Sequence, residues 1–441
     1  MNRSDRRARD YRPSNESLET RTVMSLTPPY VEFLHNVLFK SLGSQAERPN
    51  TPVAPFAATS KATFFDPTDS ITAGSRIVLG SGDYVAPFVS LDGRGGFIEV
   101  GSNTTIQDNA TLVANPSRIR GGPGIILGDN VFIGAGASVY GPGQIGAPGG
   151  AAVSIGANAV IDHASVQAGA EVGAMARVGP GVAILTGFRV LPGAQVVTEA
   201  EATNPALGRV VRLTGTDTVL AQQLTDNATL AIGYSALYQG NGATGPNISA
   251  TSPTISNGSL APVEGASQNP GSGTVSFETS AAPRFLSPFD PSTKLRVFTS
   301  HSYPIRAIGA VTIIGTDPYT AARVVGRHTS IRADEDQPIT IGSVGRIGSG
   351  VTIHGYRGGK ITAGTNLFVA NGSVLTADST GNLTLGDNVI VGINSVISGS
   401  KIGSNTAIGA YCTIINSTVP AGATIVSGTV IVNNRVLTGL S

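Results

Sequence analysis

The stretch that decides the fold is residues 160–196, VIDHASVQAGAEVGAMARVGPGVAILTGFRVLPGAQV, in which a branched apolar residue returns at every sixth position. The series is Val160, Val166, Val172, Val178, Ile184, Val190 and Val196. This period fits neither the turn of an α-helix nor the simple alternation of a strand. It fits a short strand followed by a turn, and three such units close one triangular coil of about 18 residues. The stretch therefore predicts a β-solenoid.

The same period occurs in other parts of the chain. It gives Val100, Ile106, Leu112; Leu127, Ile133, Val139, Ile145; Ile341, Ile347, Ile353; Ile390, Val396, Ile402, Ile408, Ile414; and, after a one-residue slip, Val419, Ile425, Ile431. We expect these side chains to point inward and to stack from coil to coil, with small residues at the corners. The expected fold class is all-β dominated, with two tandem left-handed parallel β-helix domains, each with an accessory helix or tail. The left hand is an exception to the usual crossover rule.

Composition divides the chain into four parts. Residues 1–79 are expected to be an N-terminal tail with a short amphipathic helix at 28–42, PPYVEFLHNVLFKSL. The first β-helix is expected at 80–238 and ends in a helix at 217–238. A Gly/Ser/Asn-rich flexible linker follows at 239–284, and the second β-helix occupies 285–441. We interpret 28–42 as a packing or docking helix rather than a membrane-surface anchor, because its polar face is not basic.

Composition also excludes several functions. Charged residues make up 13% of the chain and the net charge is +1, so no basic surface for nucleic acid is expected. Cys412 is the single cysteine, which excludes an intrachain disulfide or a cysteine-based metal site. The sequence has no run of about 18 apolar residues for a transmembrane segment. The basic N-terminus lacks the apolar stretch of a signal peptide, which favours a cytoplasmic location.

A specific motif lies in the second repeat region. Residues 328–355 read HTSIRADEDQPITIGSVGRIGSGVTIHG, and 385–403 read LGDNVIVGINSVISGSKIG. The S-I-R-x-D-E run and the later I-H-G resemble the signature of the γ-class carbonic anhydrases and of the γ-carbonic-anhydrase-like domain of the carboxysome scaffold protein. The resemblance covers most of residues 308–433 and implies a trimer of left-handed β-helices.

The first repeat region has the same layout in altered letters. Its SLDGRGGFIEVGSNTTIQDNATLV (90–113), NVFIGAGASVYGP (130–142) and VLPGAQVVT (190–198) resemble successive coils of that family. The helix at 217–238 falls where the family's C-terminal helix packs. The chain thus resembles two diverged tandem copies of one γ-carbonic-anhydrase-like domain.

The resemblance also locates the family's zinc ligands. In the family, three histidines from two adjacent subunits hold the zinc, which lowers the pKa of a bound water to about 7. The second copy keeps only His354, because the other two positions fall on Asn371 and Thr376. In the first copy the three positions are Val113, Ala135 and Tyr140. The resemblance therefore implies no intact zinc site, and zinc is possible only with a different ligand set.

Other motif positions are retained. The resemblance implies that Arg332 and Asp334 form ion pairs across the trimer interface. It makes Glu335, at the family's proton-transfer position, and Gln107, at the family's glutamine, the candidate catalytic residues. In the first copy Asp92 and Arg94 occupy the two interface positions with their charges exchanged.

Several functions remain open at this point. The favoured hypothesis is a structural or assembly subunit without a cofactor, a trimeric homo-oligomer that docks into a larger complex through residues 1–45. The alternatives are an active zinc carbonic anhydrase that uses His354, and a hexapeptide acyltransferase for which His163 is the one candidate. An adhesin or fibre is disfavoured by the motif. The arrangement of the copies is also open: three chains in two trimeric layers, or a mixed ring in which one chain supplies two of three positions.

Overall fold

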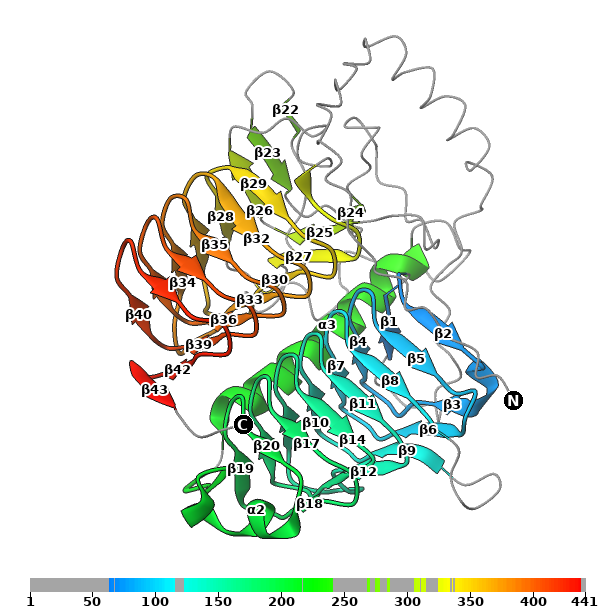
Figure 1. The fold of residues 1–441 in the computed structure, drawn as a ribbon. Helices are drawn as coiled ribbons and strands as arrows, with labels where there is room; N and C mark the ends of the chain where they lie inside the picture. Colours follow the sequence, from blue (N-terminus) through cyan, green and yellow to red (C-terminus); the bar gives the residue numbers. More distant parts are fainter. Residues whose placement is uncertain are drawn as a thin grey trace, which may run out of the picture. The chain divides into compact units, whose positions relative to one another are not determined.

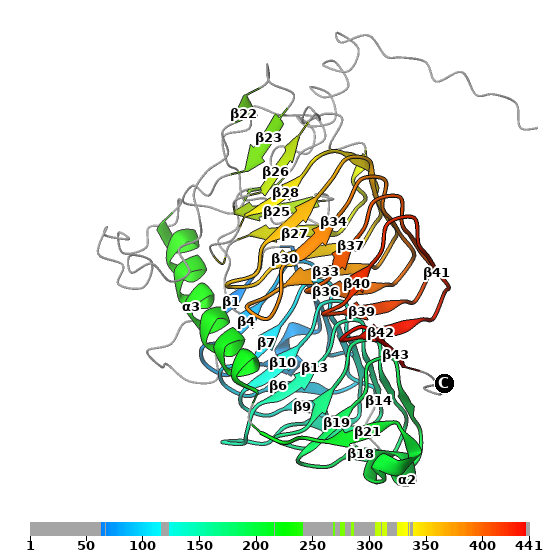
Figure 2. The same cartoon turned by 90° about the vertical axis from the view of Figure 1, so that its left-hand side faces the viewer.

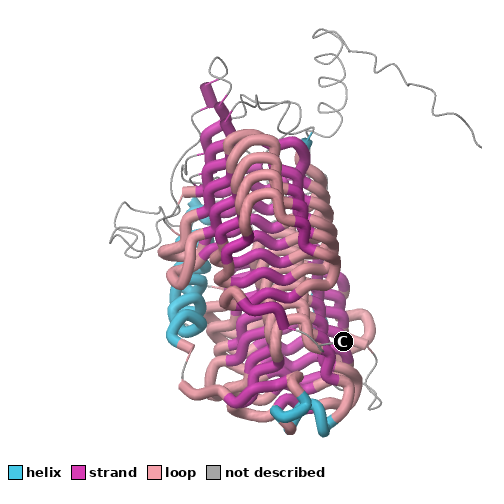
Figure 3. The backbone as a smooth tube through the Cα atoms, turned by 60° about the vertical axis from the view of Figure 1, so that its left-hand side comes forward, coloured by secondary structure: helices cyan, strands magenta, loops and turns pink. Residues whose placement is uncertain are grey.

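The computed structural model describes residues 63–66, 68–115, 123–215, 217–240, 268–269, 274–277, 284–285, 305–309, 311–314, 324–333, 335 and 338–437. Within this part of the chain, mostly parallel strands form two left-handed β-helices (Figure 1). Figure 3 shows the strands of successive coils stacked in register along the solenoid. Both β-helices belong to one unit, Gln45–Ser441. No helix in the described ranges is long and apolar enough to cross a membrane.

The first β-helix has three sheets. Sheet 1a contains β1 (Phe64–Phe65), β4 (Tyr84–Val85), β7 (Thr105–Ile106), β10 (Val131–Ile133), β13 (Val153–Ile155), β16 (Glu171–Val172), β19 (Phe188–Val190) and β21 (Val210–Arg212). Sheet 1b contains β2 (Ser70–Thr72), β5 (Ser90–Asp92), β8 (Thr111–Val113), β11 (Ser138–Tyr140), β14 (Val160–Asp162), β17 (Arg177–Val178) and β20 (Gln195–Val196). Sheet 1c contains β3 (Ile77–Val78), β6 (Phe97–Val100), β9 (Pro123–Leu127), β12 (Gly143–Ile145), β15 (Ser165–Val166) and β18 (Ala183–Ile184).

The second β-helix repeats this arrangement. Sheet 2a contains β29 (Val344–Ile347), β32 (Leu367–Val369), β35 (Ile390–Val391), β38 (Ala407–Ile408) and β41 (Thr424–Ile425). Sheet 2b contains β24 (Arg284–Phe285), β25 (Ile305–Gly309), β27 (Thr329–Ala333), β30 (Thr352–Gly355), β33 (Val374–Ala377), β36 (Val396–Ser398), β39 (Thr413–Ile415), β42 (Val430–Val432) and β43 (Arg435–Leu437). Sheet 2c contains β22 (Gln268–Asn269), β23 (Thr274–Phe277), β26 (Val311–Ile314), β28 (Ile339–Ile341), β31 (Ile361–Ala363), β34 (Leu383–Leu385), β37 (Lys401–Ile402) and β40 (Thr418–Val419).

Helices are few in the described residues. They are η1 (Gly74–Arg76), α2 (Glu199–Thr203), η2 (Pro205–Leu207) and α3 (Thr218–Gly240). The helix predicted at 217–238 is confirmed as α3. It contacts β1, β4, β7 and β10 and so covers sheet 1a (Figure 2). Strands reach further than the composition suggested, since β1 to β3 lie within the range expected as a tail and β22 and β23 within the range expected as a linker. The helix expected at 28–42 lies outside the described residues.

The core consists of stacked apolar side chains, one from each strand. In sheet 2b the register aligns Ile331, Ile353, Leu375, Ile397 and Ile414, all buried. Corner turns are closed by residues with a left-handed backbone, in many cases asparagine. Asn366 donates through Nδ2 to Oδ1 of Asn388 at 3.0 Å, and Asn388 in turn to Asn405 at 2.9 Å, so polar ladders run along the corners.

The expected inward stacking is correct for most of the series but wrong at three positions. In β14 the buried core residue is Ile161, and Val160 points outward. In β35 Val391 is buried, whereas Ile390 is 50% exposed. Val396 is buried, but it packs in a cluster with Ala135 and Ala174 of the first β-helix rather than in its own core. The reason is that the phase of the inward residue shifts by one where coil length changes, so a strict six-residue count drifts onto the outer face.

One buried carboxyl group stands apart from this apolar core. Asp83 is 1% exposed, and its Oδ1 accepts a hydrogen bond from the backbone N–H of Thr104 at 2.9 Å. Burial raises the pKa of Asp83 to about 8, and the nearby Asp129 adds to the shift. The native state therefore holds this carboxyl protonated at neutral pH.

We expect Leu375→Ala to lower the free energy of unfolding by about 2–5 kcal/mol, because it opens a cavity in the stacked core. The matched control is Thr384→Ala on the exposed outer face of β34, which should change stability little. Denaturant unfolding of the full chain measures both. Equal effects of the two substitutions would show that the register of sheet 2b is wrong.

The raised pKa of Asp83 predicts a pH dependence of stability. The unfolded carboxyl ionises near pH 3.8 and the folded one near pH 8, so unfolding releases a proton between these values. The stability that the protonated group contributes is present below pH 3.8 and is lost as the pH rises toward 8. Asp83→Asn should therefore flatten the fall in unfolding free energy between pH 5 and pH 8, measured by urea titration. An unchanged slope would contradict the assignment.

Candidate functional site

The candidate site lies where the outer face of sheet 2b meets the corner that follows sheet 1a. Two asparagines of the first copy donate hydrogen bonds across this contact: Asn109 Nδ2 donates to Thr352 Oγ1 at 3.0 Å, and Asn158 Nδ2 donates to the carbonyl oxygen of Gly372 at 2.9 Å. Small and apolar residues pack between them in a cluster of Ala135, Ala174, Val374 and Val396. The first and second β-helices, called the first and second copies from here on, thus contact each other through unlike surfaces. The second copy uses a sheet face, and the first copy uses a corner.

A buried ion pair lies at the centre of the contact. Arg332 Nη1 donates to Asp108 Oδ2 at 2.8 Å, and both side chains are fully buried. Ser330 donates through its hydroxyl to the other carboxylate oxygen, Oδ1, at 2.5 Å. The guanidinium carbon of Arg332 lies 5.2 Å from the centre of the Tyr84 ring, within the range of a cation–π contact. Each charge therefore has partners that offset part of its loss of hydration.

Gln107 extends this network to α3. Its Oε1 accepts from Arg332 Nη1 at 3.3 Å, and its Nε2 donates to Asn227 Oδ1 at 3.2 Å. Asn227 in turn donates to the carbonyl oxygen of Gln223 within the helix at 2.7 Å. The accessory helix of the first copy is thus tied, through one glutamine, to the arginine of the second.

His354 and Glu335 form the second half of the cluster. His354 Nε2 lies 3.3 Å from Glu335 Oε1, and both side chains are fully buried. The ring centres of His354 and Tyr356 are 4.0 Å apart, and Tyr356 lies 6.3 Å from Phe132 of the first copy. The other carboxylate oxygen of Glu335 accepts from the backbone N–H of Arg357 at 2.9 Å. Arg357 also contacts Asp226 of α3 at 3.2 Å.

Burial shifts the protonation equilibria here. It raises the pKa of Tyr356 well above its ordinary value, and the nearby carboxylates of Asp108 and Glu335 add to the shift. Burial likewise raises the pKa of Asp226, although its hydrogen bond from Gln222 opposes the change. Tyr356 therefore stays neutral at physiological pH and contributes a packed ring rather than a charge.

The side chains around His354 do not form a three-histidine zinc site. A catalytic zinc takes three protein ligands and keeps one open position. The register places Thr376 directly beside His354, and Ala135 of the first copy packs against Val374. No group of three or more His, Cys, Asp or Glu side chains that could hold a metal occurs in the described residues.

The other sequence candidates lie elsewhere. Asp92 and Arg94 do not meet Arg332 but pair with each other on an exposed surface, at 2.5 Å. That pairing lowers the pKa of Asp92. His163 is also outside the cluster: its Nδ1 lies 2.7 Å from Asp162 Oδ1, and Asp162 also binds Arg177. Asp334, His35, His301 and residues 1–45 lie outside the described residues.

Sequence reasoning missed several members of the cluster. Asp108 follows the predicted Gln107 directly, so its place at a coil corner was a usable signal. Tyr356 follows the predicted His354 by two residues and was equally accessible. Asn227 and Asp226 lie on α3, and nothing in their local sequence indicates a contact with the second copy. Among sequence candidates, the structure brings together Gln107, Arg332, Glu335 and His354.

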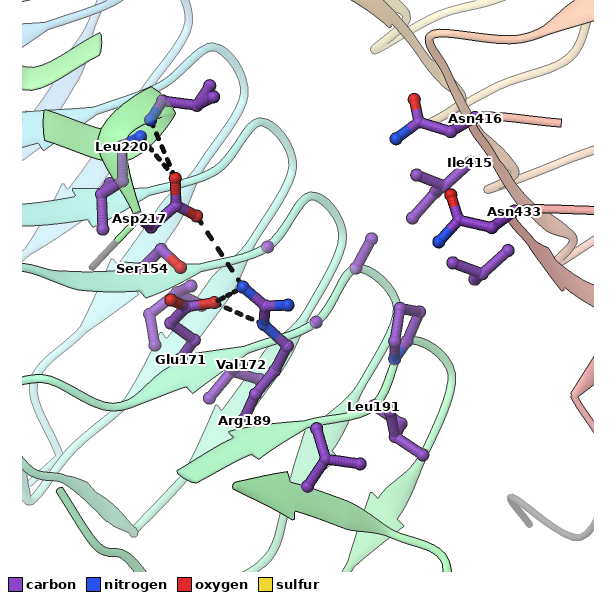
Figure 4. A pocket seen from close by; sticks show the side chains of 18 of the residues that line it. Ser154, Glu171, Val172, Arg189, Leu191, Asp217, Leu220, Ile415, Asn416 and Asn433 are labelled. Carbon is purple, nitrogen blue, oxygen red and sulfur yellow. Dashed lines mark hydrogen bonds and ion pairs between the residues drawn. The ribbon is translucent and has the colours of Figure 1, made fainter. Parts of the chain in front are cut away.

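A groove of about 840 Å³ lies beside the cluster, toward the C-terminal coils (Figure 4). On its first-copy wall, Arg189 bonds to Glu171 at 2.5 Å and approaches Asp217 at 3.8 Å. Its opposite wall includes Ile415, Asn416 and Asn433 of the second copy. The charged groups of the first wall pair with one another, and Arg435 of the second copy also lines the groove.

The chemistry available to the cluster follows from its burial. Gln107, Asp108, Arg332, Glu335 and His354 expose none of their surface. A general acid or base has to reach the proton that it transfers, directly or through one water. The arrangement described here instead fixes the register of two β-helices, because a buried guanidinium and carboxylate demand specific geometry.

No family model matches the chain, and no curated protein sequence matches it. Among solved structures, a Bacillus cereus protein titled "putative acetyltransferase" is similar at 15% identity, with a TM-score of 0.17. That match covers 42% of this chain and 96% of the other.

We expect Asp108→Asn to destabilise the protein by about 3–5 kcal/mol, because it leaves the Arg332 charge buried without its counterion. Asp92→Asn, which breaks an exposed pair, is the matched control and should have little effect. Replacing both partners, as Asp108→Leu with Arg332→Met, should recover much of the loss. Denaturant unfolding of the wild type, Asp108→Asn, Asp92→Asn, the single variants Asp108→Leu and Arg332→Met, and the double variant measures this. A double variant whose loss equals the sum of the losses of Asp108→Leu and Arg332→Met would contradict the pairing.

Proposed function

We propose that this protein is a γ-carbonic-anhydrase-like structural subunit that has lost the zinc site and serves to build a larger assembly. The observation that carries the proposal is the buried Arg332–Asp108 pair between the two copies. In the family that the sequence resembles, the arginine of the S-I-R-x-D-E motif pairs across a subunit interface. Here the same residue meets the other copy within one chain.

The residues at the ligand positions support the same reading. Asn371, Thr376, Ala135 and Tyr140 stand where three-histidine sites need imidazoles. His354, the one retained histidine, lies against Glu335 and Tyr356 with no exposed surface. This chain keeps the motif arginine that forms the interface, and it has other residues in place of the histidines that would bind zinc.

The unlike surfaces in the contact support a mixed ring. A heterologous contact, in which a face of one unit meets a different face of the next, repeats until a ring closes. The second copy uses its sheet face and the first copy uses its corner. The corner of the second copy and the sheet face of the first copy therefore remain available for further units. We propose a three-membered ring in which one chain supplies two positions, in a cytoplasmic complex that residues 1–45 help to dock.

The alternative is an active zinc enzyme with His354 in a different ligand set. Elemental analysis of the purified chain together with a CO₂ hydration assay separates the two. The proposal predicts substoichiometric zinc, no hydration above background and no effect of His354→Ala on either measurement. One zinc per chain with robust hydration, both lost in His354→Ala, would overturn it.

A further inference from the structure

The outer surface of the second β-helix carries an exposed apolar patch. It consists of Phe368 and Ile390 on sheet 2a and Ile393, Tyr411 and Val426 at the corner that follows this sheet. Their exposed fractions are 38%, 50%, 46%, 54% and 74%. The strand register places Phe368 beside Ile390 in neighbouring coils. Large apolar groups gathered on one surface of a protein usually mark a place of contact with another molecule.

The corresponding residues of the first copy indicate what this surface binds. Strand for strand, β7, β10, β13, β16 and β19 of the first copy correspond to β29, β32, β35, β38 and β41 of the second, because each set forms the sheet that precedes the contact corner. The five patch residues therefore correspond to Phe132, Ser154, Ala157, Met175 and Leu191. None of these five is exposed in the first copy.

The structure shows which residues cover these positions in the first copy. Phe132 packs with Tyr356 of the second copy and with Leu220 and Leu224 of α3. Ala157 and Met175 border the cluster that contains Val374 and Val396 of the second copy. One β-helix face thus covers both the sheet and the corner positions, whereas α3 alone covers only the sheet position.

We propose that the patch binds a β-helix domain of a different protein chain, which fills the third position of the ring. This inference rests on the proposed assembly function and names its partner. The partner presents an outer sheet face with apolar residues where the second copy has Val374 and Val396. It needs no motif arginine there, because Gly348 and Ser349 stand where the first copy has Gln107 and Asp108.

A second copy of this chain is a poor match for the patch. The face that it would present is sheet 1b, which has Val160 at the position of Val396 but Ser138 and Arg177 at the positions of Val374 and Thr413. Asp162 on that face is bound to both His163 and Arg177. Setting this polar network on Ile393 and Tyr411 would remove its charges from water without supplying partners. Charge complementarity therefore favours a partner that is not this chain.

The test is photo-cross-linking of the full-length chain in its own cells, with a photoreactive phenylalanine analogue in place of Tyr411. The matched control carries the analogue at Lys401, an exposed outer position on β37. We expect the Tyr411 probe, and not the control, to cross-link a peptide from another chain with the six-residue apolar period. Ile393→Ser should reduce this product about tenfold, the effect of losing about 1.4 kcal/mol of binding.

Three results would overturn the inference: a cross-link to a second copy of this chain, a cross-link to its own residues 28–42, or a cross-link to a protein without the repeat. An absent cross-link in a chain that runs as a monomer in its native extract would do the same. The zinc and hydration assays are independent of these outcomes. Failure of the partner assignment is therefore distinguishable from failure of the structural role.

Discussion

The ion pair between Arg332 and Asp108 is the interaction on which the rest of the structure depends. Each β-helix stacks its own apolar core, and Val430 of the second copy packs against the core of the first. The register of the contact is fixed by a guanidinium and a carboxylate that expose no surface and lie 2.8 Å apart. A buried pair of this kind contributes little net stability, since the loss of hydration offsets much of the attraction. Because the two groups must meet in one specific geometry, the pair determines how the two copies dock.

The residues of this contact are divided between the two copies. The second copy carries Arg332, Glu335 and His354, and the first carries Gln107 and Asp108. At the corresponding positions the first copy has Asp92, Gly95 and Val113, and the second has Gly348 and Ser349. These two sets of residues meet only in the contact between the first and the second copy. Two first copies, or two second copies, therefore cannot form the same contact.

How much could be read from the sequence differs between the fold and the site. The six-residue period predicts the coils because each coil must bury one branched side chain per strand. It misplaces Ile390 because a change in coil length moves the inward residue by one. The motif pointed to Arg332 as an interface residue, but its partner lies 224 residues away in the chain. No local pattern specifies which of the chain's carboxylates pairs with Arg332. Nothing in the sequence around Asn227 on α3 indicates its hydrogen bond with Gln107.

Hydrogen exchange tests most directly whether the two copies form one rigid unit through this contact. Asp108 belongs to the first copy, whereas β27 belongs to the second. Native-state exchange read by mass spectrometry should show that Asp108→Asn lowers the protection of β27 amides as strongly as that of β7 amides. Protection of β27 that is unchanged by the substitution, with β7 alone affected, would contradict the account.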